Sequence, residues 1–248
     1  MPDYDFTGPR LFLDHRLEAN AEIEASPAQA NYLLNVLRLD EGAGLLLFNG
    51  RDGEWRAALR REGRKRLWLV PQGRTRDQTP LPDLHYCFAP LKSARLDYMV
   101  QKAVEMGAGL LQPVQMQHGQ APRFNRERAG ANAVEAAEQC GILAVPECRD
   151  IVKLEPMLAG WDASRTLIFC DERAGAGDAL AVLAPLRGAP LALLIGPEGG
   201  FAASERTLLL GLPFVRAVSL GPRILRADTA AVAALALVQA AAGDWTGA

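Results

Sequence analysis

The residues of this chain that could do chemistry gather in two short stretches of its C-terminal half. One is the loop 196–200, Gly-Pro-Glu-Gly-Gly, which follows an apolar run and precedes a segment compatible with a helix. The other, LGPRILRADTA at 220–230, brings two arginines and an acid together as Arg223, Arg226 and Asp228. A guanidinium can stabilise an anion that develops on a substrate oxygen, and a carboxylate can accept a proton. These stretches are therefore the first candidates for a binding or catalytic site.

The glycine loop 196–200 fits a phosphate group poorly. A P-loop needs Lys-Ser/Thr after its glycines, which this loop lacks, and Glu198 would place a carboxylate beside the anion. A ligand that is neutral or cationic where it meets the loop suits Glu198 better, and two glycines let the backbone approach a flat ring. S-adenosylmethionine, with an adenine and a positive sulfonium, meets this description. The alternative is a tight turn before a helix, with no binding role.

Asp228 and His118 are the candidate bases. Asp228 could accept a proton, but an Asp just before a helix more often caps it, and an apolar helix is expected to begin at Thr229. His118, in MQHGQ, is of the residue type that most often serves as a base, although a single histidine at a strand end is more often a surface or RNA-contacting residue. The two arginines also have an alternative role, since one or both could pair with Glu198 or with a phosphate.

Strands and helices that alternate from residue 84 onward must position these loops. The hydrophobic period predicts strands at 84–90, 110–116, 165–172, 190–196 and 215–221, with helices at 92–107, 125–140 and 204–211 and a last helix from Thr229. Such alternation predicts a mostly parallel sheet covered by helices. Ligands of such sheets bind beyond the carboxyl ends of the strands, so the loops 170–177, 196–200 and 220–227 are expected to form the site.

The last helix carries a prediction about assembly. TAAVAALALVQAAAG, at 229–243, is apolar nearly all round, so it should be buried on every side. One subunit can hardly cover such a helix completely, and we therefore expect a homodimer interface there.

The N-terminal third differs from the rest of the chain. It predicts short strands, one helix that starts at Ser26-Pro27, and a turn at Asn49-Gly50, which together indicate a small β-barrel or sandwich that ends at the proline-rich boundary 74–83. The segment 51–76 has nine Lys and Arg against three acids, a net +6. It could contact RNA phosphates or be only a solvated face, and its tryptophans, Trp55 and Trp68, are expected in the barrel core.

Composition narrows the class of protein. The chain has 49% hydrophobic residues and a net charge of −2, as expected of a globular protein. No apolar run reaches the roughly 18 residues of a membrane span, and the acidic start of the chain is unlike a signal peptide, so a cytoplasmic location without membrane contact is expected. The cysteines form no CxxC pair, which predicts free, mostly buried thiols and no metal site.

Several segments also carry a family resemblance. LLIGPEGG at 193–200, LGPRILRADTA at 220–230, LKSARLDYMVQKAVEMGA at 91–108 and EAAEQCGILAVPE at 135–147 closely resemble segments of the RsmE family, the small-subunit rRNA uracil-N3 methyltransferases of the SPOUT superfamily; RLFL at Arg10 is similar to the family's N-terminal start. The resemblance implies an α/β protein with a PUA-like, RNA-binding β-barrel over 1–75. A trefoil-knotted SPOUT methyltransferase domain that dimerises would follow over 76–248.

The same resemblance implies methyl transfer from S-adenosylmethionine to N3 of one uridine in 16S rRNA, either as RNA or in the small ribosomal subunit. N3 carries a proton at neutral pH, so the site needs a base, a cation or both. We expect Arg226, with Arg223, to stabilise the developing charge, and Asp228 to be the candidate proton acceptor. The expected cofactor-binding residues are Leu194, Ile195, Gly196, Pro197, Glu198, Gly199, Gly200, Leu220, Gly221, Ile224 and Leu225. The expected RNA-binding residues are Arg10, Arg60, Arg61 and Arg64.

The chain departs from the family pattern at a few positions. Ala227-Asp228 stands where Thr-Glu is usual, and Ala202 lacks an N-cap hydroxyl worth about 1 kcal/mol. Ile142 and Gln117-His118 stand where the family often has arginine and Glu-Arg. Lost arginines bear on RNA contact and leave the cofactor loops intact.

Two other functions make different predictions. A non-catalytic RNA-binding protein would bind RNA without S-adenosylmethionine. An enzyme that used the loop 196–200 for a nucleotide phosphate would be inhibited by ATP and not by S-adenosylhomocysteine.

Overall fold

The computed structural model describes residues 8–63, 66–119, 124–174 and 177–246. They form two compact units. One contains the described residues up to Pro80 together with Ala137–Val145, and the other contains Leu81–Ala136 together with the described residues from Pro146 on. The prediction of a domain boundary near 75 did not foresee that a later segment of the chain would join the N-terminal unit.

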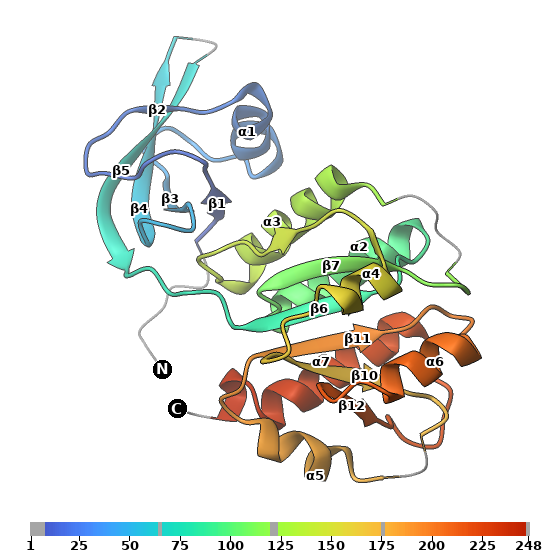
Figure 1. The fold of residues 1–248 in the computed structure, drawn as a ribbon. Helices are drawn as coiled ribbons and strands as arrows, with labels where there is room; N and C mark the ends of the chain where they lie inside the picture. Colours follow the sequence, from blue (N-terminus) through green and yellow to red (C-terminus); the bar gives the residue numbers. More distant parts are fainter. Residues whose placement is uncertain (1–7, 64–65, 120–123, 175–176, 247–248) are drawn as a thin grey trace. The chain divides into compact units, whose positions relative to one another are not determined.

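The N-terminal unit is built on a five-stranded sheet of order β1-β3-β4-β5-β2, in which only β1 and β3 pair in parallel (Figure 1). Its elements are β1 (Arg10–Phe12), β2 (Ile23–Glu24), α1 (Pro27–Asn31), a π-helical turn (Tyr32–Val36), β3 (Gly44–Phe48), β4 (Glu54–Glu62) and β5 (Arg66–Arg76). The predicted helix start is confirmed, because the Ser26 hydroxyl accepts from the Gln29 amide at 3.3 Å and the Gln29 side chain accepts from the Ser26 amide at 2.9 Å. Leucines from β3, β4 and β5 form the core.

The two tryptophans of this unit have different environments. Trp55 packs against the core, as predicted. Trp68 does not, because its ring lies under the Arg60 guanidinium at 5.6 Å and its indole N–H donates to exposed Glu62 at 2.9 Å. The prediction of a core position for Trp68 is therefore wrong.

The C-terminal unit contains the predicted parallel sheet, of order β12-β10-β11-β6-β7-β8, with β9 paired to β7 (Figure 1). Its strands are β6 (Leu84–Phe88), β7 (Leu110–Gln115), β8 (Glu147–Cys148), β9 (Val152–Lys153), β10 (Thr166–Cys170), β11 (Leu191–Ile195) and β12 (Val215–Val218). Its helices are α2 (Ser93–Glu105), α3 (Arg126–Cys140), α4 (Leu154–Ala159), α5 (Ala179–Leu183), α6 (Ala203–Leu210) and α7 (Ala227–Ala241), with 3₁₀ turns at Ala184–Leu186 and Asp244–Thr246.

The strand order explains where the site lies. The chain adds β7 and β8 on one side of β6 and then places β11, β10 and β12 on its other side, so the strand order reverses between β6 and β11. Leucines of α4 and α6 pack on one face of the sheet, and α7, which contacts α2, α5 and β11, lies on the other. Because all strands of this sheet are parallel, the loops that follow β10, β11 and β12 leave the same edge.

Helix α7 differs from its prediction in two ways. It begins at Ala227, two residues before the expected Thr229. It is also not buried on every side within this chain, because Thr229 and Ala240 are exposed and Val232 is only half-buried. No helix of the described residues is both long and apolar enough to cross a membrane.

The four cysteines are free thiols, as predicted, and Cys87 and Cys148 are buried. Burial raises the pKa of Cys87 to about 12 and that of Cys148 to about 11. Neither thiol is therefore an available nucleophile at neutral pH.

Candidate functional site

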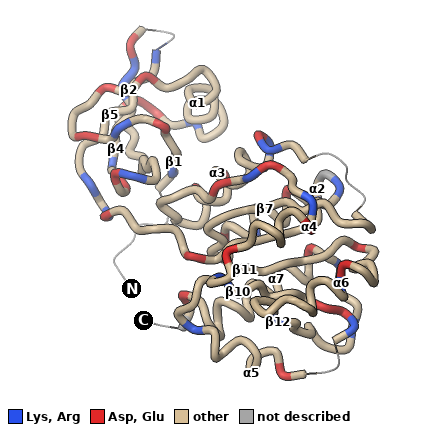
Figure 2. The backbone as a smooth tube through the Cα atoms, viewed as in Figure 1, with Lys and Arg blue, Asp and Glu red and all other residues tan. Residues whose placement is uncertain are grey.

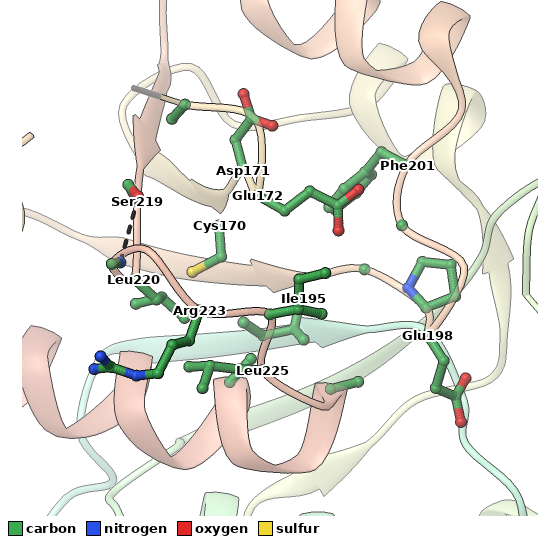
Figure 3. A pocket seen from close by; sticks show the side chains of 18 of the residues that line it. Cys170, Asp171, Glu172, Ile195, Glu198, Phe201, Ser219, Leu220, Arg223 and Leu225 are labelled. Carbon is green, nitrogen blue, oxygen red and sulfur yellow. Dashed lines mark hydrogen bonds between the residues drawn. The ribbon is translucent and has the colours of Figure 1, made fainter. Parts of the chain in front are cut away.

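The three predicted loops line one cavity of about 390 Å³ at the carboxyl edge of the parallel sheet (Figure 3). The lining residues are 170–172, 174, 195–198, 200, 201, 219–225, 227 and 230. The expectation that the loops after β10, β11 and β12 come together is therefore confirmed.

Most residues expected to bind a cofactor line this cavity. They are Ile195, Gly196, Pro197, Glu198, Gly200, Leu220, Gly221, Ile224 and Leu225. Leu194 does not, because successive side chains of a strand point to opposite faces, and Leu194 packs in the core with Phe169. Gly199 also lies outside the lining, where its Cα faces His118.

Gly196 and Phe201 fit together at the start of the β11–α6 loop. A Cβ on Gly196 would lie 2.5 Å from the Phe201 ring, which is buried and meets the Phe169 ring edge-on at 4.6 Å between centroids. The ring cannot move aside without disturbing the core. Only glycine therefore fits at position 196.

Gly200 and Glu172 meet at the end of the same loop. Gly200 has φ +69°, a left-handed conformation that favours glycine, and its amide donates to the Pro197 carbonyl at 2.9 Å. A Cβ there would lie 2.2 Å from Glu172 Oε1, so the Glu172 carboxylate covers the glycine turn, as Figure 3 shows. The Glu198 side chain points away from the cavity in the same view.

The acids after β10 were not among the predicted site residues. Buried Asp171 is neutralised by Arg206 of α6, whose Nε donates to Asp171 Oδ2 at 2.9 Å, and Asp171 Oδ1 accepts from the Arg173 amide at 3.1 Å. Glu172 has no ion pair among the described residues, and it supplies a negative charge to the cavity. The sequence feature that could have indicated Glu172 is the Asp-Glu pair directly after a buried strand.

Cys170 lines the cavity, and its sulfur points into it (Figure 3). Burial raises the pKa of the Cys170 thiol to about 12. The thiol is therefore neutral at physiological pH, and it contributes an apolar surface and not a nucleophile.

The loop after β12 offers backbone groups to the cavity. Gly221, with φ +98°, donates its amide to Ser219 Oγ at 3.3 Å. Within the described parts of the chain, the amides of Leu220, Ile224 and Leu225 have no hydrogen-bond partner. Since backbone N–H groups need a partner, these amides can donate to a ligand.

The predicted catalytic residues lie at the start of α7. Arg223 lines the cavity, whereas Arg226 is the residue before the first turn of α7 and lies outside the lining. Both are exposed, and no carboxylate of the described residues pairs with either of them, so a pairing with Glu198 is not observed. The prediction that Asp228 caps α7 is wrong, because the helix begins earlier and Asp228 lies in its first turn, where Oδ1 accepts from the Thr229 amide at 2.9 Å.

Arg10 is not placed to contact RNA. Its side chain is 6% exposed; its Nε donates to Glu54 at 2.9 Å and its other nitrogens donate to the carbonyls of Ala137, Glu138 and Ile142. The predicted RNA contact is therefore wrong, because this guanidinium joins β1 to the end of α3.

Two of the other predicted RNA-binding arginines, Arg60 and Arg61, lie in β4. Arg60 pairs with Glu22 at 2.9 Å. Arg61 is exposed, with one long contact of 3.5 Å to the Leu39 carbonyl. Arg64 lies outside the described residues. Of the two arginines that the structure describes, Arg61 is thus the one without a carboxylate partner.

The comparisons with known proteins agree with this geometry. Residues 77–239 match the model of an RNA methyltransferase domain, and residues 26–72 match that of an RNA methyltransferase PUA domain. Ribosomal RNA small subunit methyltransferase E of Rickettsia conorii is 29% identical over 93% of this chain and 94% of its own; that of Synechocystis sp. is 31% identical over 89% and 73%. The chain belongs to the RsmE family. The resemblance seen in the sequence is therefore confirmed.

Solved structures place this RsmE-family chain in the same fold. The Legionella pneumophila protein Lpg2936, in complex with its cofactor SAM, superposes with a TM-score of 0.84 at 29% identity, covering 96% of this chain and 99% of that one. Ribosomal RNA small subunit methyltransferase E of Neisseria gonorrhoeae, bound to S-adenosyl methionine, gives 0.83 at 26% identity, with the same coverage. The mixed α/β fold with a PUA-like N-terminal domain is thereby confirmed. Among the described residues, no group of three or more His, Cys, Asp or Glu could hold a metal ion.

Proposed function

We propose that this protein transfers the methyl group of S-adenosylmethionine to N3 of one uridine in 16S rRNA. One observation carries the proposal: in a chain of the RsmE family, the loops after β10, β11 and β12 line a single cavity. Relatives of this chain are named for methylation of small-subunit rRNA, and two solved structures of similar fold hold the cofactor.

The cavity residues fit S-adenosylmethionine in size and in chemistry. A cavity of about 390 Å³ falls within the range of roughly 300–1,000 Å³ that is typical of small-molecule sites. Ile195, Leu225 and Phe201 give apolar surface for a purine ring, and the loop amides can donate to ring nitrogens. Glu172 suits the positive charge of the ligand and would oppose a phosphate.

The arginines complete the reaction chemistry. S-adenosylmethionine, when bound, supplies an electrophilic methyl group next to a positive sulfonium. Arg226 stabilises the negative charge that develops on a uracil oxygen as N3 loses its proton, and Arg223, at the cavity wall, helps to orient the reactants. Asp228 accepts the N3 proton; Thr229 occupies Oδ1, and Oδ2 has no partner among the described residues.

The finer architecture is part of the same proposal. Residues 1–75 form a PUA-like barrel that binds RNA with Arg60, Arg61 and Arg64, and residues 76–248 form a trefoil-knotted SPOUT domain. A second copy of the chain covers the incompletely buried side of α7, so the enzyme acts as a homodimer. Its partner is 16S rRNA or the small ribosomal subunit, and its location is the cytoplasm.

Mass spectrometry of rRNA tests the activity. Small subunits and free 16S rRNA from a strain without the native methyltransferase are incubated with the protein and S-adenosylmethionine, and nuclease fragments are mapped. We expect one added methyl group on one uridine, at N3. Absence of methylation on both substrates, with a folded protein, would contradict the proposal.

The contribution of the loop is tested by Gly196→Val. We expect this variant to lose S-adenosylmethionine binding in calorimetry, since the side chain would displace Phe201. Gly130→Ala is the matched control, because its Cβ meets nothing within 4 Å. Unchanged affinity in Gly196→Val would remove the loop from the cofactor site.

A further inference from the structure

His118 contacts the backbone of the glycine loop 196–200 but does not line the cavity. It follows β7 and lies against the β11–α6 loop, where its Nδ1 is 3.2 Å from the carbonyl oxygen of Gly199 and 3.2 Å from that of Gly200. The backbones are packed together there, because a Cβ on Gly199 would lie 3.0 Å from His118 Cβ. His118 itself does not line the cavity. Any effect of His118 on the cavity must therefore pass through the loop.

The two carbonyl neighbours determine which ring nitrogen carries the proton. A carbonyl oxygen can only accept a hydrogen bond, so Nδ1 must be the donor whether the ring is neutral or charged. In neutral His118 the lone pair is then on Nε2. The contact thus predicts the Nδ1–H tautomer.

Gln117, the preceding residue, contacts the start of α6. Its amide donates to Glu205 Oε1 at 2.8 Å, and its side-chain nitrogen donates to Ser204 Oγ at 3.1 Å. Buried Glu205 also accepts from the Ala202 amide at 3.0 Å. This is one of the two hydrogen bonds of a capping box; the other needs a side-chain oxygen at position 202, which alanine lacks. The end of β7 thus fixes both the glycine turn and the start of α6.

We propose that His118 is a positioning residue for the cofactor cavity, because its Nδ1–H fixes the carbonyls of Gly199 and Gly200. Gly200 lies between His118 and the Glu172 carboxylate, and its left-handed φ leaves the turn free to change conformation when one side is released. This inference rests on the proposed function, because it assumes that the cavity binds S-adenosylmethionine.

Calorimetry with S-adenosylmethionine tests the role through two variants. His118→Phe keeps a planar ring without the donor, and we expect a dissociation constant about five to ten times higher, in keeping with the loss of one hydrogen bond. His118→Asn places an amide N–H near the position of Nδ1 and should bind within about twofold of the wild type. Gln115→Ala, on an exposed side chain of the same strand end, is the control and should not change affinity.

The outcomes separate this inference from the proposed function. A wild-type protein that takes up no S-adenosylmethionine would overturn the proposed function and, with it, this role. Uptake by the wild type with equal affinity in His118→Phe would overturn the role of His118 alone. Thermal unfolding of each variant verifies that it is folded.

A second readout observes the imidazole directly. Long-range ¹⁵N–¹H spectra of the neutral ring should show Nδ1 protonated and Nε2 unprotonated for His118. A predominant Nε2–H tautomer would contradict the hydrogen bond from Nδ1 to the loop carbonyls, whatever the affinities show. Exposed His15, which makes no side-chain hydrogen bond to the described residues, is the internal reference.

Discussion

Arginines have opposite environments in the N-terminal unit and in the candidate site. In the N-terminal unit most of the described arginines pair with carboxylates. Figure 2 shows where the basic and acidic residues lie along the backbone. The pairs are Arg10–Glu54, Arg76–Glu54, Arg16–Glu18, Arg51–Asp14, Arg60–Glu22, Arg66–Glu24, Arg66–Glu62 and Arg74–Asp77. In the candidate site, Arg223 and Arg226 are exposed and have no carboxylate partner among the described residues.

A run of basic residues therefore does not by itself indicate a nucleic-acid site. The net +6 of segment 51–76 counts only the acids inside that segment, whereas Asp14, Glu22, Glu24 and Asp77 lie outside it and reach its arginines. The positive potential of a paired arginine is largely cancelled by the carboxylate beside it. Two unpaired arginines beside a cavity can stabilise a new negative charge.

The largest effect is expected when the paired cluster is broken. Arg10→Met should lower the free energy of unfolding by about 3–5 kcal/mol, because it removes a buried partner of Glu54 and leaves carbonyls at the end of α3 without a donor. Urea denaturation measures it. Arg56→Met, at an exposed arginine of the same sheet, is the control and should stay within about 0.5 kcal/mol. A loss below about 1 kcal/mol in Arg10→Met would show that the cluster is not structural.

The unpaired arginines should affect catalysis instead of stability. Arg226→Ala should reduce the methylation rate by about 10²–10³-fold, the typical effect of losing a group that stabilises transition-state charge, while S-adenosylmethionine binding and stability stay unchanged. Arg223→Ala should also weaken cofactor binding, since Arg223 lines the cavity and Arg226 does not. Exposed Arg187 provides the control alanine variant. Full activity of Arg226→Ala would refute its role.

The pH dependence of stability tests the pairing of Glu54 with Arg10 and Arg76. Burial alone would raise the pKa of Glu54, but hydrogen bonds from Arg76 and Arg10 outweigh it and hold the pKa below 4.5. A lowered folded-state pKa gives stability that is present above the unfolded pKa and is lost as the pH falls through the folded one. Unfolding free energy should therefore fall as the pH drops below about 4.5, with a shallower slope in Arg10→Met. An equal slope in the wild type and in Arg10→Met would show that a group other than Glu54 causes the pH dependence.

The smallest effects are expected on the β4 surface. If residues along β4 contact phosphates, Arg61→Ala should reduce the slope of log affinity against log salt by about 0.7–0.9. Arg60→Ala should reduce it less, because Glu22 already neutralises Arg60 at 2.9 Å. Filter binding of a 16S rRNA fragment at several salt concentrations measures both. Equal slopes for both variants would contradict the distinction between paired and free arginines.

The sequence was enough to predict the parallel sheet and the meeting of its loops. Both follow from local information, because strand and helix periods alternate from residue 84 on and parallel strands end at one edge. The face of each side chain in β11 could not be predicted in this way. Every residue of Leu191–Ile195 is buried, so no polar alternation shows that Ile195 meets the cavity and Leu194 the core.

Contacts between residues that are far apart along the chain could not be predicted from the sequence either. Arg10 and Glu54 are 44 positions apart, and Arg10 and Ile142 are 132 apart, so neither spacing nor periodicity relates them. The RLFL start was therefore assigned to RNA contact from resemblance alone, and the structure gives its arginine a different role. His118 is a similar case, since its partners Gly199 and Gly200 come 81 and 82 positions later.

Titration calorimetry with S-adenosylmethionine can show whether the loops after β10, β11 and β12 form one cofactor cavity. We expect saturable binding to the folded wild-type protein, displacement by S-adenosylhomocysteine, and no displacement by ATP. No uptake by folded protein, or displacement by ATP and not by S-adenosylhomocysteine, would contradict it.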